Sequence, residues 1–315
     1  MPRVELKNKT TTIDVTNMIS ETRWSGSESE VARVLELQFL YPLHDVYVPK
    51  IYPNIGDTMY LYADTSEELF RGKVFYNERL GEQGTIQITC YDDAIRLAKS
   101  KGTYNFKNKT AEAITQTVCN DLGMRAGKLA STGIPQKMLC SNMGMYEIVK
   151  SAYENAGKQN GKKYNIIMKK GELYVEEVGK EVLDYILKAD SNILETSYSE
   201  NAEGVVNRVK IYDENGQYVG VVQDNESVDL VGVFQDVYVK EVDNHVKAVA
   251  QNMLKEINKE VIITMLGNGK VTCGKVIRIE SSLAELKVDF YIGLDEHSWR
   301  DACYTMKINL ILYNT

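Results

Sequence analysis

The chain has few of the residues from which catalytic sites and metal centres are usually built. It contains 3 His, 5 Cys and 2 Trp among its 315 residues. The cysteines are scattered and never form a C-x-x-C pair; they are Cys90, Cys119, Cys140, Cys273 and Cys303. An odd number of dispersed cysteines indicates buried thiols in a reducing compartment, and it argues against a disulfide framework or a zinc site.

Long apolar runs and an excess of basic charge are also missing. No stretch approaches the ~18 apolar residues of a membrane-spanning helix, so no membrane insertion is expected. The N-terminal MPRVELKNKTTTIDV lacks the apolar segment of a signal peptide. The net charge is −7, from 37 basic and 44 acidic residues. A general nucleic-acid binder needs a basic face, so the charge argues against specific nucleic-acid binding, although nucleic acid can still pass nearby.

The three histidines are the first candidates for catalysis. His44, His245 and His297 are far apart in the sequence, and none lies in a metal-ligand spacing such as HExxH. We interpret His245, beside an expected helix cap, as a surface residue, and His297, just after an expected strand, as a structural one. Ser298, His297 and Asp295 are the residue types of a catalytic triad, but neighbours on one segment rarely aim their side chains at a common point. No catalytic residue is therefore assigned.

Other motifs of catalytic or ligand-binding sites are incomplete. GNGK (267–270) resembles part of a phosphate loop, but Val271 follows it where Ser or Thr is needed, so a β-turn is predicted. GSESE (26–30) is interpreted as a polar loop. A hydrolase would need paired carboxylates at a defined separation in a cleft, whereas adjacent acidic residues are usually solvated surface. The pairs in question are Asp92/Asp93, Glu176/Glu177 and Asp295/Glu296. The sequence thus predicts no catalytic, cofactor-binding or metal site, and no cofactor.

The first hundred residues have the pattern of β-strands. Tyrosine, with 20 residues against 6 Phe, suits half-buried pleated surfaces and interfaces. Apolar residues alternate with polar ones, which predicts strands in which Leu35, Leu37 and Phe39 share one face, and Ile86, Ile88 and Cys90 another. Further strands are expected at 56–63 and 71–79. The run 91–100 changes to a helical pattern, and we expect its Ala94, Ile95 and Leu97 to pack at the mouth of this β unit.

The rest of the chain changes to a mixed pattern and then returns to strands. Residues 103–190 predict two helices and a hairpin: a helix from Ala111 capped by Thr110, a helix over 145–156 ended by Gly157 and Gly161, and a hairpin over 164–178 turning at Lys170-Gly171. Residues 205–224 predict a hairpin with Asn215-Gly216 at its turn. The later elements expected are extended pieces over 229–242, a helix over about 244–258 capped by Asn244, and strands at 260–266, 270–280, 287–294 and 305–314.

These patterns predict a β-rich α+β fold with three domains. Residues 1–102 form an N-terminal β domain of short strands, typical of a small barrel or sandwich. Residues 103–195 form a small α/β module of two helices plus a hairpin. Residues 196–315 form a second β domain with one inserted helix.

Four stretches, in this order, resemble the baseplate hub proteins of phage tails and phage-tail-like bacteriocins, in particular the XkdQ/YqbQ-like family. They are ITCYDDAIRLAKS (88–100), KTAEAITQTVCNDLGM with KLASTGIPQK (109–137), NAEGVVNRVKIYDENG (201–216), and FYIGLDEHSW with YTMKINLIL (290–299, 304–312). The resemblance extends over nearly the whole length. None of these stretches contains reactive chemistry, so what carries it is their joint order.

The resemblance implies a non-enzymatic structural subunit. It implies two tube-like β-barrel domains per chain and a homotrimeric ring, whose six barrels adapt the six-fold tail tube to a three-fold central spike. The partners implied are the tail tube protein, the spike protein, other baseplate proteins and a tape-measure protein. The location implied is the baseplate of a virion or phage-tail-like particle, after synthesis in the bacterial cytoplasm. No appended peptidoglycan-degrading domain is expected after Thr315, and the net negative charge suggests a repulsive channel lining.

Several alternatives and details stay open. Another structural tail component, such as a distal tube or adaptor protein, is the nearest alternative to a hub, and a cell-wall hydrolase or a glycan-binding module is a more distant one. Phage is not separated from DNA-free bacteriocin, nor a contractile tail from a non-contractile one. The sequence does not identify the residues of the subunit, tube and spike interfaces.

Overall fold

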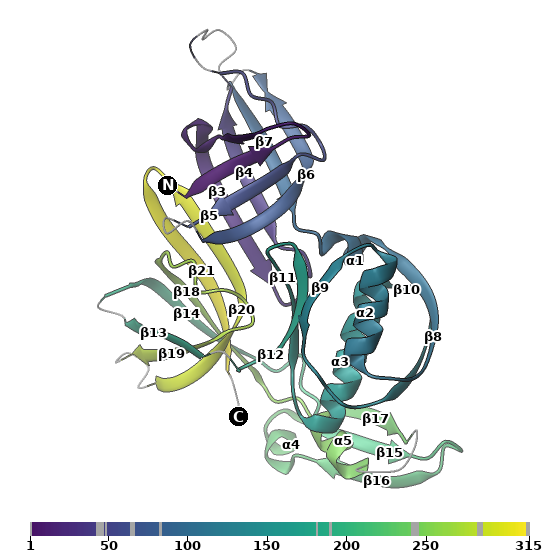
Figure 1. The fold of residues 1–315 in the computed structure, drawn as a ribbon. Coiled ribbons are helices and arrows are strands. Elements are labelled where there is room, and N and C mark those ends of the chain that lie inside the picture. The colour runs from purple at the N-terminus through teal and green to yellow at the C-terminus, as the bar shows by residue number, and fades with distance from the viewer. Residues whose placement is uncertain are drawn as a thin grey trace.

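The structure is a computed structural model whose described residues form four hydrophobic cores, each centred in one unit of the chain (Figure 1). It describes residues 2–41, 47, 49–63, 67–81, 84–180, 182–188, 191–240, 246–281 and 286–312. His44, His245 and the expected helix cap Asn244 lie outside these residues. We name the units, in chain order, the N-terminal β unit, the α/β module, the small unit and the C-terminal β unit.

In the part of the chain that the structure describes, the N-terminal β unit has seven strands around one apolar core. Its elements are β1 (Arg3–Lys7), β2 (Thr12–Asp14), β3 (Ile19–Ser27), β4 (Val34–Leu40), β5 (Thr58–Tyr62), β6 (Glu68–Leu80) and β7 (Thr85–Tyr91), with a short 3-10 helix at Thr16–Met18. The predicted alternation is confirmed, because Leu35, Leu37 and Phe39 of β4 are buried opposite Cys90, Ile88 and Ile86 of β7. One face of the sheet is therefore apolar, and the other is left polar.

The α/β module contains the two predicted helices and the predicted hairpin, together with strands that the sequence patterns missed. Its elements are α1 (Ile95–Lys99), β8 (Lys101–Lys109), α2 (Ala111–Asp121), β9 (Arg125–Leu129), β10 (Gln136–Gly144), α3 (Met145–Asn160), β11 (Tyr164–Lys169) and β12 (Glu172–Glu177). Helix α3 continues past Gly157, where a Cβ would lie 2.5 Å from the carbonyl oxygen of Lys162. It ends at Gly161, whose φ of +72° suits glycine.

Helix α1 corrects one expectation about packing. Ala94, Ile95 and Leu97 are buried as predicted, but they pack into the core of the α/β module. Val31 and Ala32, from the loop between β3 and β4, join the same core. The predicted position at the mouth of the N-terminal β unit is therefore wrong, because α1 packs against α3 and β10 of the module instead.

The small unit contains the predicted Asn215-Gly216 hairpin. Its elements are β15 (Arg208–Tyr212), β16 (Tyr218–Gln223), α4 (Asn225–Val231), β17 (Gln235–Val239) and α5 (Val246–Asn252). The expectation of extended structure from 229 onward is wrong in its first part. The Asp224 side chain accepts a hydrogen bond from the Ser227 N–H, which caps α4. Helix α5 ends at Asn252, earlier than the predicted limit near 258.

The described residues of the C-terminal β unit form six strands around their own core. They are β13 (Val182–Lys188), β14 (Ile193–Asn201), β18 (Asn258–Leu266), β19 (Val276–Ser281), β20 (Leu286–Arg300) and β21 (Cys303–Leu312). Strand β13 lies within the range 103–195 that the sequence assigned to the α/β module, yet it pairs with β19. Its Leu187 packs into the core of the C-terminal β unit.

Strand β20 joins the two β units into one sheet. Its first half pairs with β19, its second half with β3, and nearly its whole length with β21. Figure 1 shows this long strand running from the C-terminal β unit into the N-terminal one. The strand order β14-β18-β21-β20-β3-β4-β7-β6-β5-β1-β2 is an open path among the described residues. The β-rich α+β fold class is confirmed, and the closed barrels stay a prediction.

No helix among the described residues is long and apolar enough to cross a membrane.

Candidate functional site at the junction of three units

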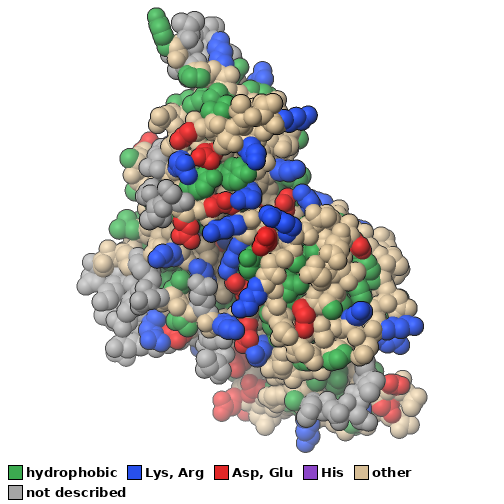
Figure 2. All heavy atoms as spheres, in the orientation of Figure 1, with side chains coloured by type: hydrophobic (Ala, Val, Ile, Leu, Met, Phe, Trp, Pro, Cys, Tyr) green, Lys and Arg blue, Asp and Glu red, His purple; other side chains and the backbone are tan. Residues whose placement is uncertain are grey.

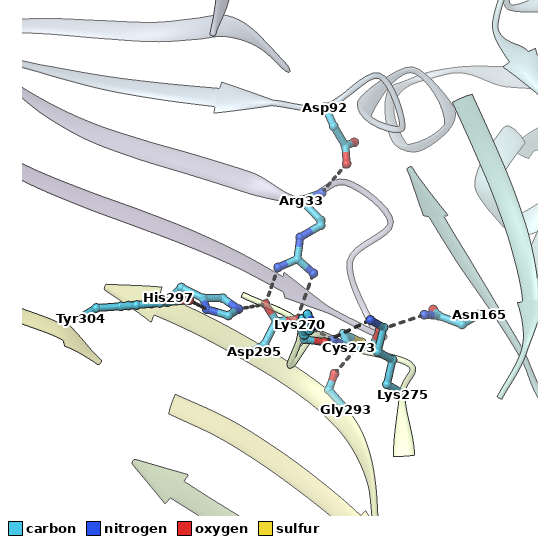
Figure 3. Close-up of polar contacts among 10 residues, drawn as sticks. All are labelled: Arg33, Asp92, Asn165, Lys270, Cys273, Lys275, Gly293, Asp295, His297 and Tyr304. Atoms are coloured by element: carbon cyan, nitrogen blue, oxygen red, sulfur yellow. Dashed lines mark hydrogen bonds and ion pairs between the residues drawn. The ribbon is translucent and has the colours of Figure 1, made fainter. Parts of the chain in front are cut away.

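Arg33 and Asp295 form the centre of a buried polar network where three units meet (Figure 3). Arg33 precedes β4, and Asp295 lies in the second half of β20. The guanidinium donates from Nη1 to Asp295 Oδ1 over 3.0 Å and from Nη2 to Asp295 Oδ2. Gly26 of β3 makes room for it, because a Cβ there would lie 2.4 Å from Arg33 Nη1. The two β units are thus tied by a bidentate ion pair, a geometry in which charge-assisted hydrogen bonds are strong.

Asp92 connects the same arginine to the α/β module. The Arg33 backbone N–H donates to Asp92 Oδ2 over 3.1 Å, and the Ala94 N–H donates to Asp92 Oδ1 over 3.0 Å. Asp92 is buried just before α1. It therefore fixes the start of that helix and the loop that holds Arg33 at the same time.

His297 extends the network toward the core of the N-terminal β unit. Its Nε2 lies 3.1 Å from Asp295 Oδ2, and its Nδ1 lies 2.8 Å from the Tyr304 hydroxyl. The ring also packs 4.7 Å from Trp24, measured between centroids, while the Arg33 guanidinium carbon lies 4.0 Å from the centre of the Trp24 ring. The Trp24 ring therefore covers both the imidazole and the guanidinium.

Further hydrogen bonds connect the same three units around this centre. The Cys273 N–H donates to Asp295 Oδ1 over 2.6 Å, and the Cys273 carbonyl accepts from Asn165 Nδ2 of β11 over 3.4 Å. Tyr291 of β20 donates to Glu28, in the loop after β3. Each of the three units therefore contacts the other two through named polar groups.

The burial of these groups sets their protonation. Burial would raise the pKa of Asp295, but the Arg33 cation and the hydrogen bonds from Arg33 and His297 outweigh it and hold that pKa well below its usual range. Burial and the Arg33 cation lower the pKa of His297, although Asp295 opposes them, so the imidazole is neutral at pH 7. Burial raises the pKa of Asp92 to about 7 despite its two backbone donors.

The geometry of the network does not offer a place for a substrate. The side chains of Asp295 and His297 have no exposed surface, and Ser298 points to the opposite face of β20, where it pairs with Arg23. The cavity beside Arg33 and Asp92 measures about 10 Å³, which is the size of a single water site. The described residues contain no group of three or more His, Cys, Asp or Glu side chains that could hold a metal ion. The network is therefore suited to holding the units together.

The candidate residues from the sequence differ in their burial and contacts in the structure. The interpretation of the acidic pairs as solvated surface is wrong for Asp92 and Asp295, which are 3% and 0% exposed, because Arg33 and backbone N–H groups satisfy them. Glu176 is partly exposed and binds Lys169. GNGK forms a turn closed by the Val271 N–H and the Asn268 carbonyl, 3.0 Å apart. Four cysteines are buried as expected, whereas Cys303 is exposed.

Sequence reasoning missed Arg33, Trp24 and Tyr304. An arginine in a loop carries no local signal of burial, because its partner Asp295 lies 262 positions away. A partial signal exists in β20, where Asp295, His297 and Trp299 alternate and so share one face. Only the pairing of β20 with β3 places that face against the core.

The chain has the fold of a phage tail protein. The 43 kDa tail protein of prophage MuSo2 from Shewanella oneidensis superimposes with a TM-score of 0.73, over 98% of each chain and at 16% identity. This likeness rests on the fold alone.

The chain belongs to the YqbQ-like family, whose model matches residues 22–311. Among its relatives, YqbQ of Bacillus subtilis is 25% identical over 306 residues, which cover 93% of this chain and 90% of the relative. The XkdQ protein of the phage-like element PBSX, also from Bacillus subtilis, is 26% identical over 273 residues, or 82% of each chain. The resemblance that the four sequence stretches carried is thereby confirmed.

Proposed function

We propose that the chain is a non-enzymatic hub subunit of a phage tail or phage-tail-like particle. Three copies form a ring between the six-fold tail tube and the three-fold central spike, and the ring contacts other baseplate proteins. The proposal draws support from the family, from the XkdQ relative in a phage-like element, and from the tail-protein fold. The buried polar network contributes rigidity, which a permanent assembly needs more than a turnover enzyme does.

The observation that carries the proposal is the continuous sheet with two unpaired strand edges. At one end lies β14, and no other described strand pairs with its far side. On the other side, the sheet continues from the first half of β6 through β5 and β1 to β2. Strand β5 pairs with β6 only up to Lys73, however, so the segment 75–80 of β6 has a described strand on one side only. Both segments are largely exposed. Exposed strand edges invite pairing with another chain, and a closed ring removes them.

The direction of the strands favours head-to-tail pairing of these two ends. The path β14-β18-β21-β20-β3-β4-β7-β6 contains seven antiparallel pairings in succession. Because seven reversals is an odd number, β14 and β6 run in opposite directions. A rotation axis parallel to the strands preserves strand direction, so β14 of one copy would meet β6 of the next copy as an antiparallel neighbour. The ring would then be one uninterrupted sheet.

The polar face of this sheet is the proposed channel lining. Among the residues that the registers place on it are six carboxylates and four cations, which together sum to −2; they are Glu21, Glu36, Glu78, Glu195, Glu260 and Glu296, and Arg23, Lys73, Arg300 and Lys307. A negative surface repels nucleic acid and so lets it slide past. A tape-measure protein would pass along the same surface.

The number of copies follows from the two β units in each chain. Three copies present six β units, which match a six-fold tube, while the whole ring keeps three-fold symmetry for the spike. The proposal includes a tube-like β-barrel domain over residues 1–102 and another over 196–315, on either side of the module 103–195. Such a ring would reside in the baseplate of the particle.

The native mass of the purified full-length chain, alone and with its spike protein, tests the proposal. A species of three chains in either sample is the expected result. A strict monomer in both samples would overturn the ring. It would favour an adaptor role that requires no self-association.

A further inference from the structure

The small unit has one covered face and one open face. Its sheet has the order β16-β15-β17, and Val209 and Ile211 of β15 point to the covered side, where they pack with Ala250 of α5. Helix α5 is also attached to the α/β module, because Asn252 Nδ2 donates to the Lys158 carbonyl of α3 over 3.0 Å. The opposite face of the sheet therefore points away from the body of the molecule, at the end far from the N-terminal β unit (Figure 1).

Away from Arg208 and its neighbours Gln223 and Gln235, the residues that flank the central strand on the open face are apolar or aromatic. The register places Lys210 between Val221 and Val237, and Tyr212 between Tyr218 and Val239. The rings of Tyr212 and Tyr218 meet edge to face at 5.9 Å between centroids. The flanking side chains are about half exposed: Val221 44%, Val237 47%, Val239 49% and Tyr218 58%. We call this surface, Lys210, Tyr212, Tyr218, Val221, Val237 and Val239, the outer face.

An exposed apolar surface of this kind needs an explanation. Single apolar residues are common on protein surfaces, but contiguous patches mark interaction sites. Figure 2 shows one face of the molecule. Where the N-terminal β unit meets the α/β module, this face carries a mixture of basic and acidic side chains. The Arg71–Glu68 ion pair lies at this contact, because Arg71 is next to Met168 and Gly171 of the α/β module. The outer face lacks such pairs among the described residues.

Lys210 indicates which kind of group a protein that covers the outer face must supply. No described carboxylate pairs with Lys210, whereas the Nε of its neighbour Arg208 donates to the Gln223 amide oxygen over 2.5 Å. Covering an apolar surface around an unpaired cation is unfavourable unless the covering surface supplies a carboxylate. Two copies of this face related by a two-fold axis would instead bring Lys210 toward Lys210. The charge therefore opposes self-association through this face.

We propose that the outer face docks a different protein of the same particle, through apolar side chains that surround a carboxylate placed opposite Lys210. The inference rests on the proposed function for the source of that partner. It assigns copy-to-copy contacts to β14 and β6 and contacts with the other protein to the small unit. The two kinds of contact thus use separate surfaces of the chain.

A photo-crosslinker in the assembled particle tests this assignment. The full-length chain carries p-benzoyl-L-phenylalanine in place of Tyr218, particles are purified and irradiated, and mass spectrometry identifies the adduct. The expected adduct joins Tyr218's position to a different protein, at a site close to an Asp or Glu. In a Lys210→Glu background the adduct should fall by roughly tenfold or more, because like charges then face each other. A Lys210→Arg background keeps it.

Three results would overturn the proposal. They are adducts only to other copies of this chain, no adduct at all, and an adduct that Lys210→Glu leaves unchanged. The same crosslinker in place of Tyr198 on β14 separates this failure from failure of the ring. Adducts from β14 to a second copy, without the expected adduct from the outer face, leave the ring standing. A chain that never enters the particles overturns both.

Discussion

Arg33 and Asp295, 262 positions apart in the sequence, form a bidentate ion pair between the first β unit and the last. The pair lies beside the point where β20 changes partners from β19 to β3. The backbone of the same arginine binds Asp92 of the α/β module. One residue therefore contacts all three units, and its loss should affect how they unfold relative to one another.

Asp295→Asn should destabilise the chain strongly, because it leaves the Arg33 cation buried without a counter-charge. The expected cost is roughly 3–5 kcal/mol in the free energy of unfolding. The double variant Arg33→Met with Asp295→Leu should cost less than the single one, because it removes both charges. Urea unfolding followed by tryptophan fluorescence measures this directly, since both tryptophans, Trp24 and Trp299, pack against His297.

The Arg278–Asp289 pair supplies a matched control for this comparison. It has similar geometry, with Nε 2.8 Å from Oδ1, but its side chains are 54% and 33% exposed. Asp289→Asn should therefore cost less than about 1 kcal/mol. Equal costs at Asp289 and Asp295 would contradict the argument from burial.

Asp92 should make stability fall as the pH rises. Its pKa is raised to about 7 in the folded chain from 3.8, so between these values the folded chain holds a proton that the unfolded chain has lost. Relative to Asp92→Asn, the wild-type chain should lose on the order of 1–3 kcal/mol from about pH 4 to about pH 7. Urea unfolding of both proteins across this range is the measurement. Parallel pH profiles would mean that Asp92 titrates normally.

His297 should give the opposite dependence on pH. Burial and the nearby Arg33 cation lower its pKa in the folded chain and outweigh the opposing effect of Asp295. The imidazole also contacts the Tyr304 hydroxyl. A base with a lowered pKa contributes stability above its unfolded value near 6.5, and that stability is lost as the pH falls. The advantage of the wild-type chain over His297→Gln should thus shrink from pH 7.5 to pH 5.5, by at most about 1.4 kcal/mol per pH unit. An unchanged difference over this range would contradict a neutral, buried imidazole.

The elements with local signals could be predicted from the sequence. The Lys170-Gly171 turn, the Asn215-Gly216 turn and the helix beginning at Ala111 are set by residues that are neighbours in the chain. Helix α4 was missed although Asp224 and Gly232 mark its ends, because the apolar residues of 228–239 also fit a strand. Where propensities conflict in this way, tertiary contacts decide the outcome.

The junction could not be predicted, because its chemistry depends on pairings between distant segments. Asp92 and Asp93 look alike in the sequence, yet only Asp92 is buried, through the Arg33 and Ala94 N–H groups. Likewise, Asp295 and Glu296 point to opposite faces of β20, and the register with β3 decides which face is buried. A shift of this register by one residue would exchange the two.

Charges placed on β14 test the proposed ring closure. Leu194 and Tyr198 are 58% and 54% exposed, so Leu194→Lys with Tyr198→Lys should fold normally. Lysines on an edge strand oppose pairing with another chain, so the double variant should fall from the trimeric to the monomeric mass. Tyr218→Lys, equally exposed on the small unit, is the matched control and should keep three chains. A trimer that survives lysines on β14 would place the copy-to-copy contact elsewhere, because repulsive side chains at a paired edge cannot coexist with the continuous sheet.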